Sequence, residues 1–258
     1  MNTAGSPRVS IGVPVFNGEN YLAAALDSLL NQTYRDFELI IADNASTDRT
    51  AEICAGFASA DSRVSYLRNE VNIGVDENFN RVFRVSRGEY FKWAAHDDLC
   101  APTFLERCIE VLDRDSSVVL CHPRAMIIDE HGSVAGRFEI QVDATSSKAH
   151  ERFYNLIHVD HWCFEIYGLI RANALRRTML HGLYSGSDRV LLAELGLLGR
   201  FHELPEFLFF RRDHPLTSMR VSQGHAKRLT AYSPADGSRA SRFLGLRRFQ
   251  GYASAVRR

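Results

Sequence analysis

Short apolar runs rich in β-branched and aromatic residues alternate with stretches of helical spacing along the first hundred residues. The expected strands cover residues 9–16, 37–42, 64–67 and 89–95. After the first strand, Leu22, Leu26 and Leu29 recur three or four positions apart, which predicts an amphipathic helix. A further helix is expected through Asn80 and Phe83, after a polar turn.

Strands that alternate with helices favour an α/β fold with a single, mostly parallel sheet and helices on both faces. In such sheets, ligands bind outside the carboxyl ends of the strands. Three polar clusters follow strands at these positions: Phe16-Asn17, Asp43 and Asp97-Asp98. Because parallel strands end at one edge, these clusters predict a common binding site.

The pair Asp97-Asp98 is the strongest chemical signal in the chain. Two adjacent carboxylates at a strand end concentrate negative charge, which a bound cation stabilises. Oxygen ligands favour hard ions such as Mg²⁺ or Mn²⁺. The alternative is a solvated turn, in which Asp is common.

The composition fits one globular domain with an appended region. The chain has 258 residues, of which 45% are hydrophobic and 24% charged. We expect no transmembrane helix, because no apolar run approaches about 18 residues, and no signal peptide. Five cysteines without CxxC spacing suit free thiols in a reducing cytoplasm.

The net charge of zero conceals a basic C-terminal tail at residues 220–258. This tail holds nine Lys or Arg against one acid, Asp236, so that residues 1–219 carry the compensating negative charge. Phe243, Leu246 and Phe249 are spaced as on one face of a short amphipathic helix. The tail is interpreted either as an exposed end or as an anchor on an anionic membrane, and no nucleic-acid recognition module is legible.

Four motifs, in this order, resemble those of glycosyltransferase family 2, whose members use nucleotide-diphosphate sugars as donors. They are VPVFN (13–17), SLLNQTY (28–34), FELIIADNASTD (37–48) and the segment from GEY to HDD (88–98). The resemblance is strong from about Val9 to Glu106, thinner to Pro215 and absent beyond.

The resemblance implies a GT-A fold and a metal-dependent, inverting transfer of a sugar to an acceptor hydroxyl, with a glycan or glycolipid as the suggested acceptor. It divides the chain into a glycosyltransferase domain, 1–219, and the tail. Within the domain, residues 8–125 form the nucleotide-sugar half and 126–219 the acceptor half. The expected location is the cytoplasm, including the inner face of the membrane; the oligomeric state is not predicted.

For the donor, the resemblance implies a cofactor, Mn²⁺ or Mg²⁺, held by Asp98, with Asp97 accepting from donor hydroxyls. It assigns Asp43 to the nucleobase; a turn or helix-capping role remains the alternative. The first loop, with Pro14, Phe16 and Asn17, would pack on base and ribose.

The later segments supply the remaining candidate residues. Arg211 and Arg212 are candidates for the diphosphate, and His214 for the metal or the phosphate. Asp188 is the candidate general base, with an N-cap as the alternative.

The acceptor candidates are Trp162 and Tyr167, which would stack on sugar rings. For most of residues 158–168 a buried core strand is the favoured interpretation.

Two positions depart from the family pattern. The Asp-x-Asp signature is replaced by His96-Asp97-Asp98, and a frequent Arg-Asn pair is replaced by Phe79-Asn80. A sugar nucleotidyltransferase and a non-catalytic relative remain alternative classes. The first is disfavoured because the loop after the first strand lacks a glycine cluster and a lysine.

Overall fold

The computed structural model describes residues 5–138, 142–215, 217 and 244–257 of the chain. The elements up to residue 128 are β1 (Val9–Val15), α1 (Leu22–Leu30), β2 (Phe37–Asp43), α2 (Thr50–Ala60), β3 (Val64–Arg68), α3 (Val75–Arg84), β4 (Tyr90–Trp93), β5 (Leu99–Cys100), α4 (Phe104–Arg114) and β6 (Val118–Ile128). The later elements are β7 (Val134–Arg137), α5 (Ala149–His158), the 3₁₀ helix η1 (Phe164–Tyr167), β8 (Leu169–Arg171), α6 (Ala172–Leu175), α7 (Ser187–Leu198), β9 (Arg200–Arg212) and α10 (Leu244–Arg257).

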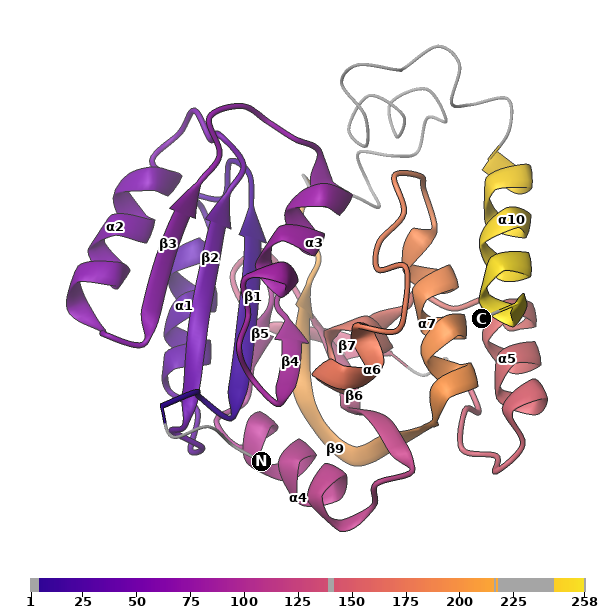
Figure 1. Ribbon diagram of the computed structural model, residues 1–258. Coiled ribbons are helices and arrows are strands. Elements are labelled where there is room, and N and C mark those ends of the chain that lie inside the picture. The colour runs from indigo at the N-terminus through magenta and orange to yellow at the C-terminus, as the bar shows by residue number, and fades with distance from the viewer. Residues whose placement is uncertain (1–4, 139–141, 216, 218–243, 258) are drawn as a thin grey trace.

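The strands form one sheet in the order β3-β2-β1-β4-β8-β6-β9-β5, with β7 paired to β6 (Figure 1). β1 runs parallel to β2 and β4, and β2 runs parallel to β3. β8 is antiparallel to both of its neighbours, whereas β6 and β9 run parallel. The predicted α/β fold with a mostly parallel sheet is therefore confirmed.

The sheet separates two hydrophobic clusters because successive side chains of a strand point to opposite faces. On β2, Leu39 and Ile41 pack in the cluster under α1, α2 and α4, whereas Ile40 and Ala42 pack on the face covered by α3 and α7. Gly12 lets α3 approach β1 closely, since a Cβ there would lie 2.6 Å from Val82 Cγ2. Both faces are covered by helices, as the sequence pattern predicts.

The prediction of a buried strand within residues 158–168 is wrong. This segment forms a loop followed by η1. Cys163 adopts the left-handed conformation with φ 58°, which turns the chain away from an extended course. Residues four apart then meet: His161 Nδ1 lies 3.2 Å from Glu165 Oε2 in the interior.

The C-terminal helix predicted within the basic tail is present as α10, beside α7 and α5 (Figure 1). Tyr252 meets Phe153 of α5 edge-to-face, with ring centroids 6.1 Å apart. Phe243 lies outside the described residues, as do the side chains of Leu246 and Phe249. The division into domains stays a prediction.

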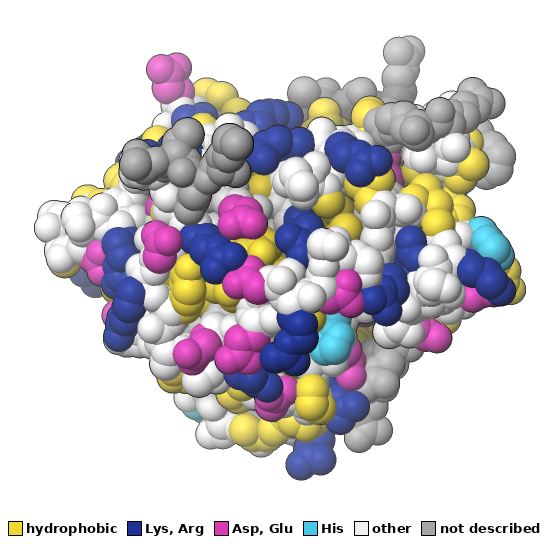
Figure 2. Space-filling view, turned by 60° about the horizontal axis from the view of Figure 1, so that its bottom comes forward, with side chains coloured by type: hydrophobic (Ala, Val, Ile, Leu, Met, Phe, Trp, Pro, Cys, Tyr) yellow, Lys and Arg dark blue, Asp and Glu magenta, His cyan; other side chains and the backbone are white. Residues whose placement is uncertain are grey.

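Within the described part of the chain, no helix is long and apolar enough to span a membrane. On the face drawn in Figure 2, acidic and basic side chains are interspersed. The acidic side chains on this face therefore do not form one separate patch.

Candidate functional site

The sheet has a topological switch point between β1 and β4. From β1 the chain proceeds to β2 and β3 on one side and then returns to place β4 on the other. Ligands of open α/β sheets bind at such a point, outside the carboxyl ends of the strands. β1 pairs with β4 from Val9 to Gly12, over the whole length of β4, so β1 continues past the end of β4 to the buried Pro14, which has no N–H to donate. The first candidate loop therefore begins where the sheet opens.

The loops after β1 and β2 are tied to each other. Asn17, which has a positive φ of 50°, receives the backbone N–H of Thr47 on its side-chain oxygen at 2.9 Å. Its own backbone N–H donates to Ser46 Oγ at 2.9 Å. Phe16 beside it is 44% exposed. The loops thus form one surface with an aromatic ring available to a ligand.

Asp43 ends β2 and is fully buried. Its Oδ1 accepts the backbone N–H of Ser46 at 2.8 Å, and its Oδ2 accepts the hydroxyl of Tyr66 at 3.0 Å. Arg68 Nε lies 3.6 Å from the same carboxylate. Asp43 lies on the predicted edge, where it also organises the loop that follows it.

Asp97 and Asp98 follow β4 and have different partners. His214 Nε2 donates to Asp97 Oδ2 at 3.0 Å, and the backbone N–H of Arg212 donates to Asp98 Oδ1 at 2.8 Å. Burial and the adjacent Asp97 charge raise the pKa of Asp98 well above its ordinary value. Burial opposes ionisation of Asp97 as well, but the hydrogen bond from His214 and the charge of His96 leave its pKa below its ordinary value.

The end of β9 holds this carboxylate pair in place. Arg212 donates from Nε to the backbone oxygen of Asp97 at 2.9 Å and from Nη1 to the backbone oxygens of Asp129 and Glu130 at 3.1 Å. Its guanidinium carbon also lies 4.9 Å from the centroid of the Tyr21 ring. These contacts make Arg212 a structural tie between three segments.

Arg211 has less extensive contacts. Its Nη1 pairs with Asp213 at 3.2 Å, and its guanidinium carbon lies 5.9 Å from the centroid of the Trp162 ring. It is therefore the arginine of this pair that is better placed to exchange partners for a bound anion.

The predicted metal ligands, Asp98 and His214, both lie near the end of β9, and Asp97, which is predicted to bind donor hydroxyls, contacts His214. In the described part of the chain, no group of three or more His, Cys, Asp or Glu is placed so that it could hold a metal ion. Mg²⁺ and Mn²⁺ are commonly held by one or two carboxylates together with substrate phosphates and water. The Asp98 carboxylate fits that requirement together with substrate phosphates, and the His214 ring lies beside Asp97, to which its Nε2 donates.

Asp188 lies in the first turn of α7, not at its N-cap, which is Gly186 with a φ of 83°. Its Oδ1 accepts the backbone N–H of the next residue, Arg189, at 2.8 Å. The side chain is partly exposed. Asp188 is therefore not the N-cap of α7. As an acid in the first turn, it is favoured by the helix dipole.

Arg189 joins the start of α7 to the acceptor segment. Its guanidinium donates to the backbone oxygens of Val159 and His161 at 3.2 and 2.9 Å, and to Asp160 at 2.9 Å. The charge of Asp188 also contributes to raising the pKa of Cys163, after the larger effect of burial. The candidate base and the segment that contains Trp162 are therefore neighbours.

The two aromatic candidates for the acceptor differ in exposure. Trp162 is 45% exposed and packs against Phe138 and Phe164 at centroid distances of 5.3 and 5.8 Å. Tyr167 is partly buried and stacks on Phe209 at 5.6 Å. Trp162 is the one whose ring can meet a ligand without rearrangement.

Asp76 of α3, which the sequence pattern did not single out, is buried near Asp188, and Asn80 is buried on the same helix. Burial raises the pKa of Asp76 to about 8, with a smaller contribution from the charge of Asp188. Asp76 Oδ2 and His181 Nε2 have no hydrogen-bond partner among the described residues. An acid in the first turn of a helix is common, so only the tertiary structure distinguishes Asp76 from a surface residue.

Lys92 is another buried polar residue that the sequence analysis did not assign to a role. It is buried on β4, donates to the backbone oxygen of Tyr167, and its Nζ lies 4.0 Å from the centroid of the Phe104 ring. The sequence did offer a signal for this buried charge, since Lys92 stands among the aromatic residues of a predicted strand. Its charge partly offsets the rise in the pKa of Asp98.

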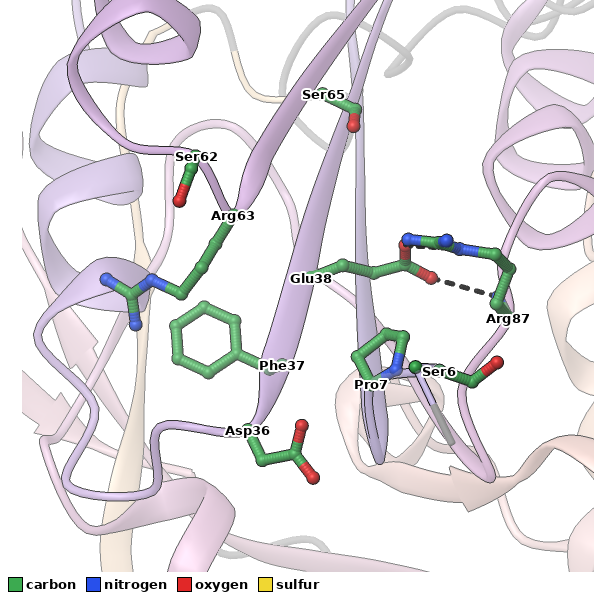
Figure 3. A pocket seen from close by; sticks show the side chains of 10 residues that line it. Ser6, Pro7, Asp36, Phe37, Glu38, Ser62, Arg63, Ser65 and Arg87 are labelled. Carbon is green, nitrogen blue, oxygen red and sulfur yellow. Dashed lines mark hydrogen bonds and ion pairs between the residues drawn. The ribbon is translucent and has the colours of Figure 1, made fainter. Parts of the chain in front are cut away.

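A shallow polar pocket lies at the opposite edge of the sheet, near the amino ends of β2 and β3 (Figure 3). Its central charges are paired: Arg87 Nη2 donates to Glu38 Oε2 at 2.7 Å, and the Ser10 hydroxyl donates to Glu38 Oε1 at 2.6 Å. Because this edge is away from the carboxyl ends of the strands, we interpret the pair as structural.

Comparison with known proteins connects this geometry to one family. The family model for glycosyl transferase family 2 matches residues 10–182. An uncharacterized glycosyltransferase of Rickettsia typhi is 36% identical over 126 residues, which cover 48% of this chain and 38% of that protein. Glycosyltransferase GlyG of Streptococcus pneumoniae is 34% identical over 116 residues, covering 45% and 38%. The chain thus spans less than two fifths of the length of these relatives.

Solved structures share the fold at low sequence identity. S. aureus TarS 1-349 in complex with UDP-GlcNAc has a TM-score of 0.67 at 17% identity and covers 96% of this chain and 71% of its own. The mannosyltransferase PcManGT of Pyrobaculum calidifontis, in complex with GDP-Man and Mn²⁺, has a TM-score of 0.59 at 16% identity, covering 98% and 74%. These similarities show the GT-A type of fold.

Proposed function

The chain belongs to glycosyl transferase family 2, and from this premise we propose that it transfers a sugar from a nucleotide-diphosphate sugar to an acceptor hydroxyl. The observation that carries the proposal is the arrangement at the end of β4. There, two carboxylates lie against His214 and Arg212, next to the switch point of the sheet. A hard divalent cation and a diphosphate are the ligands that suit this combination of charges.

For the donor, we assign Asp43 to the nucleobase and the Phe16-Asn17 loop to the base and ribose. Asp97 accepts from donor hydroxyls, while Asp98 and His214 would hold Mn²⁺ or Mg²⁺. When bound, the cation neutralises negative charge that grows on the leaving diphosphate. Arg211, rather than the structurally engaged Arg212, binds a phosphate oxygen. The solved relative with GDP-Man and Mn²⁺ supports this type of donor site.

Asp188 acts on the acceptor in this proposal. Its carboxylate accepts the proton of the acceptor hydroxyl, whose oxygen then bonds to the anomeric carbon. The bond from that carbon to the diphosphate breaks, and the nucleoside diphosphate leaves with the electron pair. A single displacement of this kind inverts the anomeric configuration. Trp162, exposed and adjacent to the same segment, stacks on the acceptor sugar.

We also propose a cytoplasmic location at the inner face of a membrane, with a lipid-linked or glycan acceptor. The support is the excess of Lys and Arg in residues 220–258. Each basic residue near an anionic surface contributes about 1 kcal/mol of attraction, which salt weakens.

The test is a panel of UDP, GDP, ADP and dTDP sugars with Mn²⁺, Mg²⁺ or EDTA, assayed first for binding and then for turnover. We expect one nucleotide class to bind in a metal-dependent manner and to be hydrolysed slowly without acceptor. Binding without turnover towards any acceptor in a glycan array would favour the non-catalytic class. Absence of binding throughout would refute the proposal.

A further inference from the structure

The loop that leads to Asp188, residues 181–187, is held at both ends by one face of α3. At the first end, Asn80 donates from Nδ2 to the backbone oxygen of His181 at 2.8 Å and accepts its N–H on Oδ1 at 2.9 Å. At the other end, the Ser187 hydroxyl donates to Asp76 Oδ1 at 3.1 Å. Asp76 and Asn80 are four residues apart and so lie on the same side of the helix.

These contacts are sheltered from water. All four side chains are buried, and only 5% of Asp76 is exposed. The ring of His181 packs edge-on against Trp93 of β4 and Phe79 of α3, with centroids 5.0 and 5.2 Å apart. Hydrogen bonds in such surroundings are stronger than at the surface, and an unpaired buried group is costly. The two ends of the loop, His181 and Ser187, are therefore fixed relative to α3.

The opposite side of α3 is bound to the end of β2 and to the loop after it, which we assign to the donor. Asn78 donates to the backbone oxygen of Ala42 at 2.8 Å. Asn44, next to Asp43, donates to the backbone oxygen of Gly74 at 3.2 Å, and Gly74 is the N-cap of α3. Because α3 is short and is bonded on both sides, it keeps the loop before α7 at a fixed distance from the loop after β2.

We infer that Asp76 is a positioning residue. Through the Ser187 hydroxyl it fixes the first turn of α7, and hence Asp188, at a set place relative to the donor loops. The inference rests on the proposed function, because it gives Asp188 the role of base. It adds that α3 aligns the base with the donor, an alignment on which transfer rates depend steeply.

The unpaired Oδ2 of Asp76 fits this role. A residue needed only to fill the space between α3 and α7 would be replaced at lower free energy by an apolar side chain, since a buried carboxyl without a full set of partners destabilises the fold. What the Asp76 carboxyl provides, and an apolar side chain would not, is a hydrogen-bond acceptor for Ser187, the residue before Asp188.

The test compares Ser187→Ala, Asp76→Ala and Asp76→Asn with Glu77→Gln as the control. Glu77 is the next residue on α3 and pairs with Arg84 at the surface, so this control removes a carboxylate without touching the loop. Asp76→Asn keeps an oxygen that accepts from Ser187. Binding of UDP and GDP with Mn²⁺ is measured by calorimetry, turnover with whichever donor sugar the wild type uses, and backbone hydrogen exchange over residues 181–190.

We expect Ser187→Ala and Asp76→Ala to lower kcat by about 10- to 100-fold with unchanged nucleotide affinity and donor KM. Amide exchange over residues 181–190 should speed up in both, while Asp76→Asn should restore kcat to within about threefold and Glu77→Gln should match the wild type.

Unchanged kcat despite faster exchange would overturn the inference, and so would a parallel loss of nucleotide affinity. A wild-type protein that binds neither nucleotide would instead refute the proposed function, and the inference with it.

Discussion

The burial of Asp76 leads to a prediction about the pH dependence of protein stability, which can be tested without an enzyme assay. Its carboxyl is buried between α3 and α7, and burial raises its pKa from 3.8 to about 8. Between these values the unfolded chain releases a proton that the folded chain retains. The stabilising contribution is therefore complete below pH 4 and is lost as the pH rises towards 8. The free energy of unfolding should fall by about 1.4 kcal/mol per pH unit from this group alone.

The perturbation is Asp76→Asn, which keeps the shape and the acceptor for Ser187 but cannot ionise. Other titrating groups contribute equally to both proteins, so the difference between them isolates Asp76. From pH 5 to pH 7 the variant should gain about 3 kcal/mol relative to the wild type. That is a large part of the 5–15 kcal/mol typical of a whole domain.

The assay is urea unfolding followed by tryptophan fluorescence, since Trp93 is fully buried and reports on the core. Stability is measured at half-unit steps from pH 5 to pH 9 for both proteins, with Glu77→Gln as a surface control. The difference should grow with pH and level off above about 8. A difference that stays constant over the whole range would show that Asp76 is already ionised in the folded protein, and the reasoning would be wrong.

Three further predictions concern the proposed site and the tail. Asp98→Asn should fold normally but lose most metal-dependent donor binding and turnover, which calorimetry with and without Mn²⁺ would detect; wild-type turnover at limiting metal would contradict the assignment. Asp188→Asn should leave nucleotide affinity nearly intact and lower kcat by roughly 10²-fold or more; equal losses in both would point to a donor-side role. Replacing Arg239, Arg242, Arg257 and Arg258 by Gln should weaken flotation with anionic liposomes at least about tenfold, in a salt-dependent manner; absence of wild-type binding at low ionic strength would remove the support for a lipid acceptor.

The predictions from sequence were correct where the local pattern of apolar and polar residues is clearest. β1 and β2 are continuous apolar runs, α1 has clear helical spacing, and parallel strands necessarily end at one edge. The placement of Phe16, Asp43 and Asp97 on that edge followed from these facts alone.

The parts that could not be predicted depend on contacts between distant residues. β8 has only three residues and no periodicity, so its antiparallel insertion between β4 and β6 leaves no local signal. The bond from Asn80 to His181 spans 101 residues. The predicted strand in residues 158–168 failed because apolar composition does not reveal a left-handed turn at Cys163 or a pairing of His161 with Glu165.

The late position of β9 in the chain determines when, during synthesis, the candidate site can form. β9 lies between β6 and β5, and Arg212 at its end bonds to the carboxylate of Asp98 and to the backbone oxygen of Asp97 in the β4 loop. Arg212 follows Asp98 by 114 residues. At ribosomal rates of about 5–20 residues per second, a nascent chain spends on the order of 10 s with β1 to β4 synthesised and this anchor still missing. During that time Asp97 and Asp98 lack the partners that β9 and His214 later supply, so the proposed donor site should form only after β9 has joined the sheet.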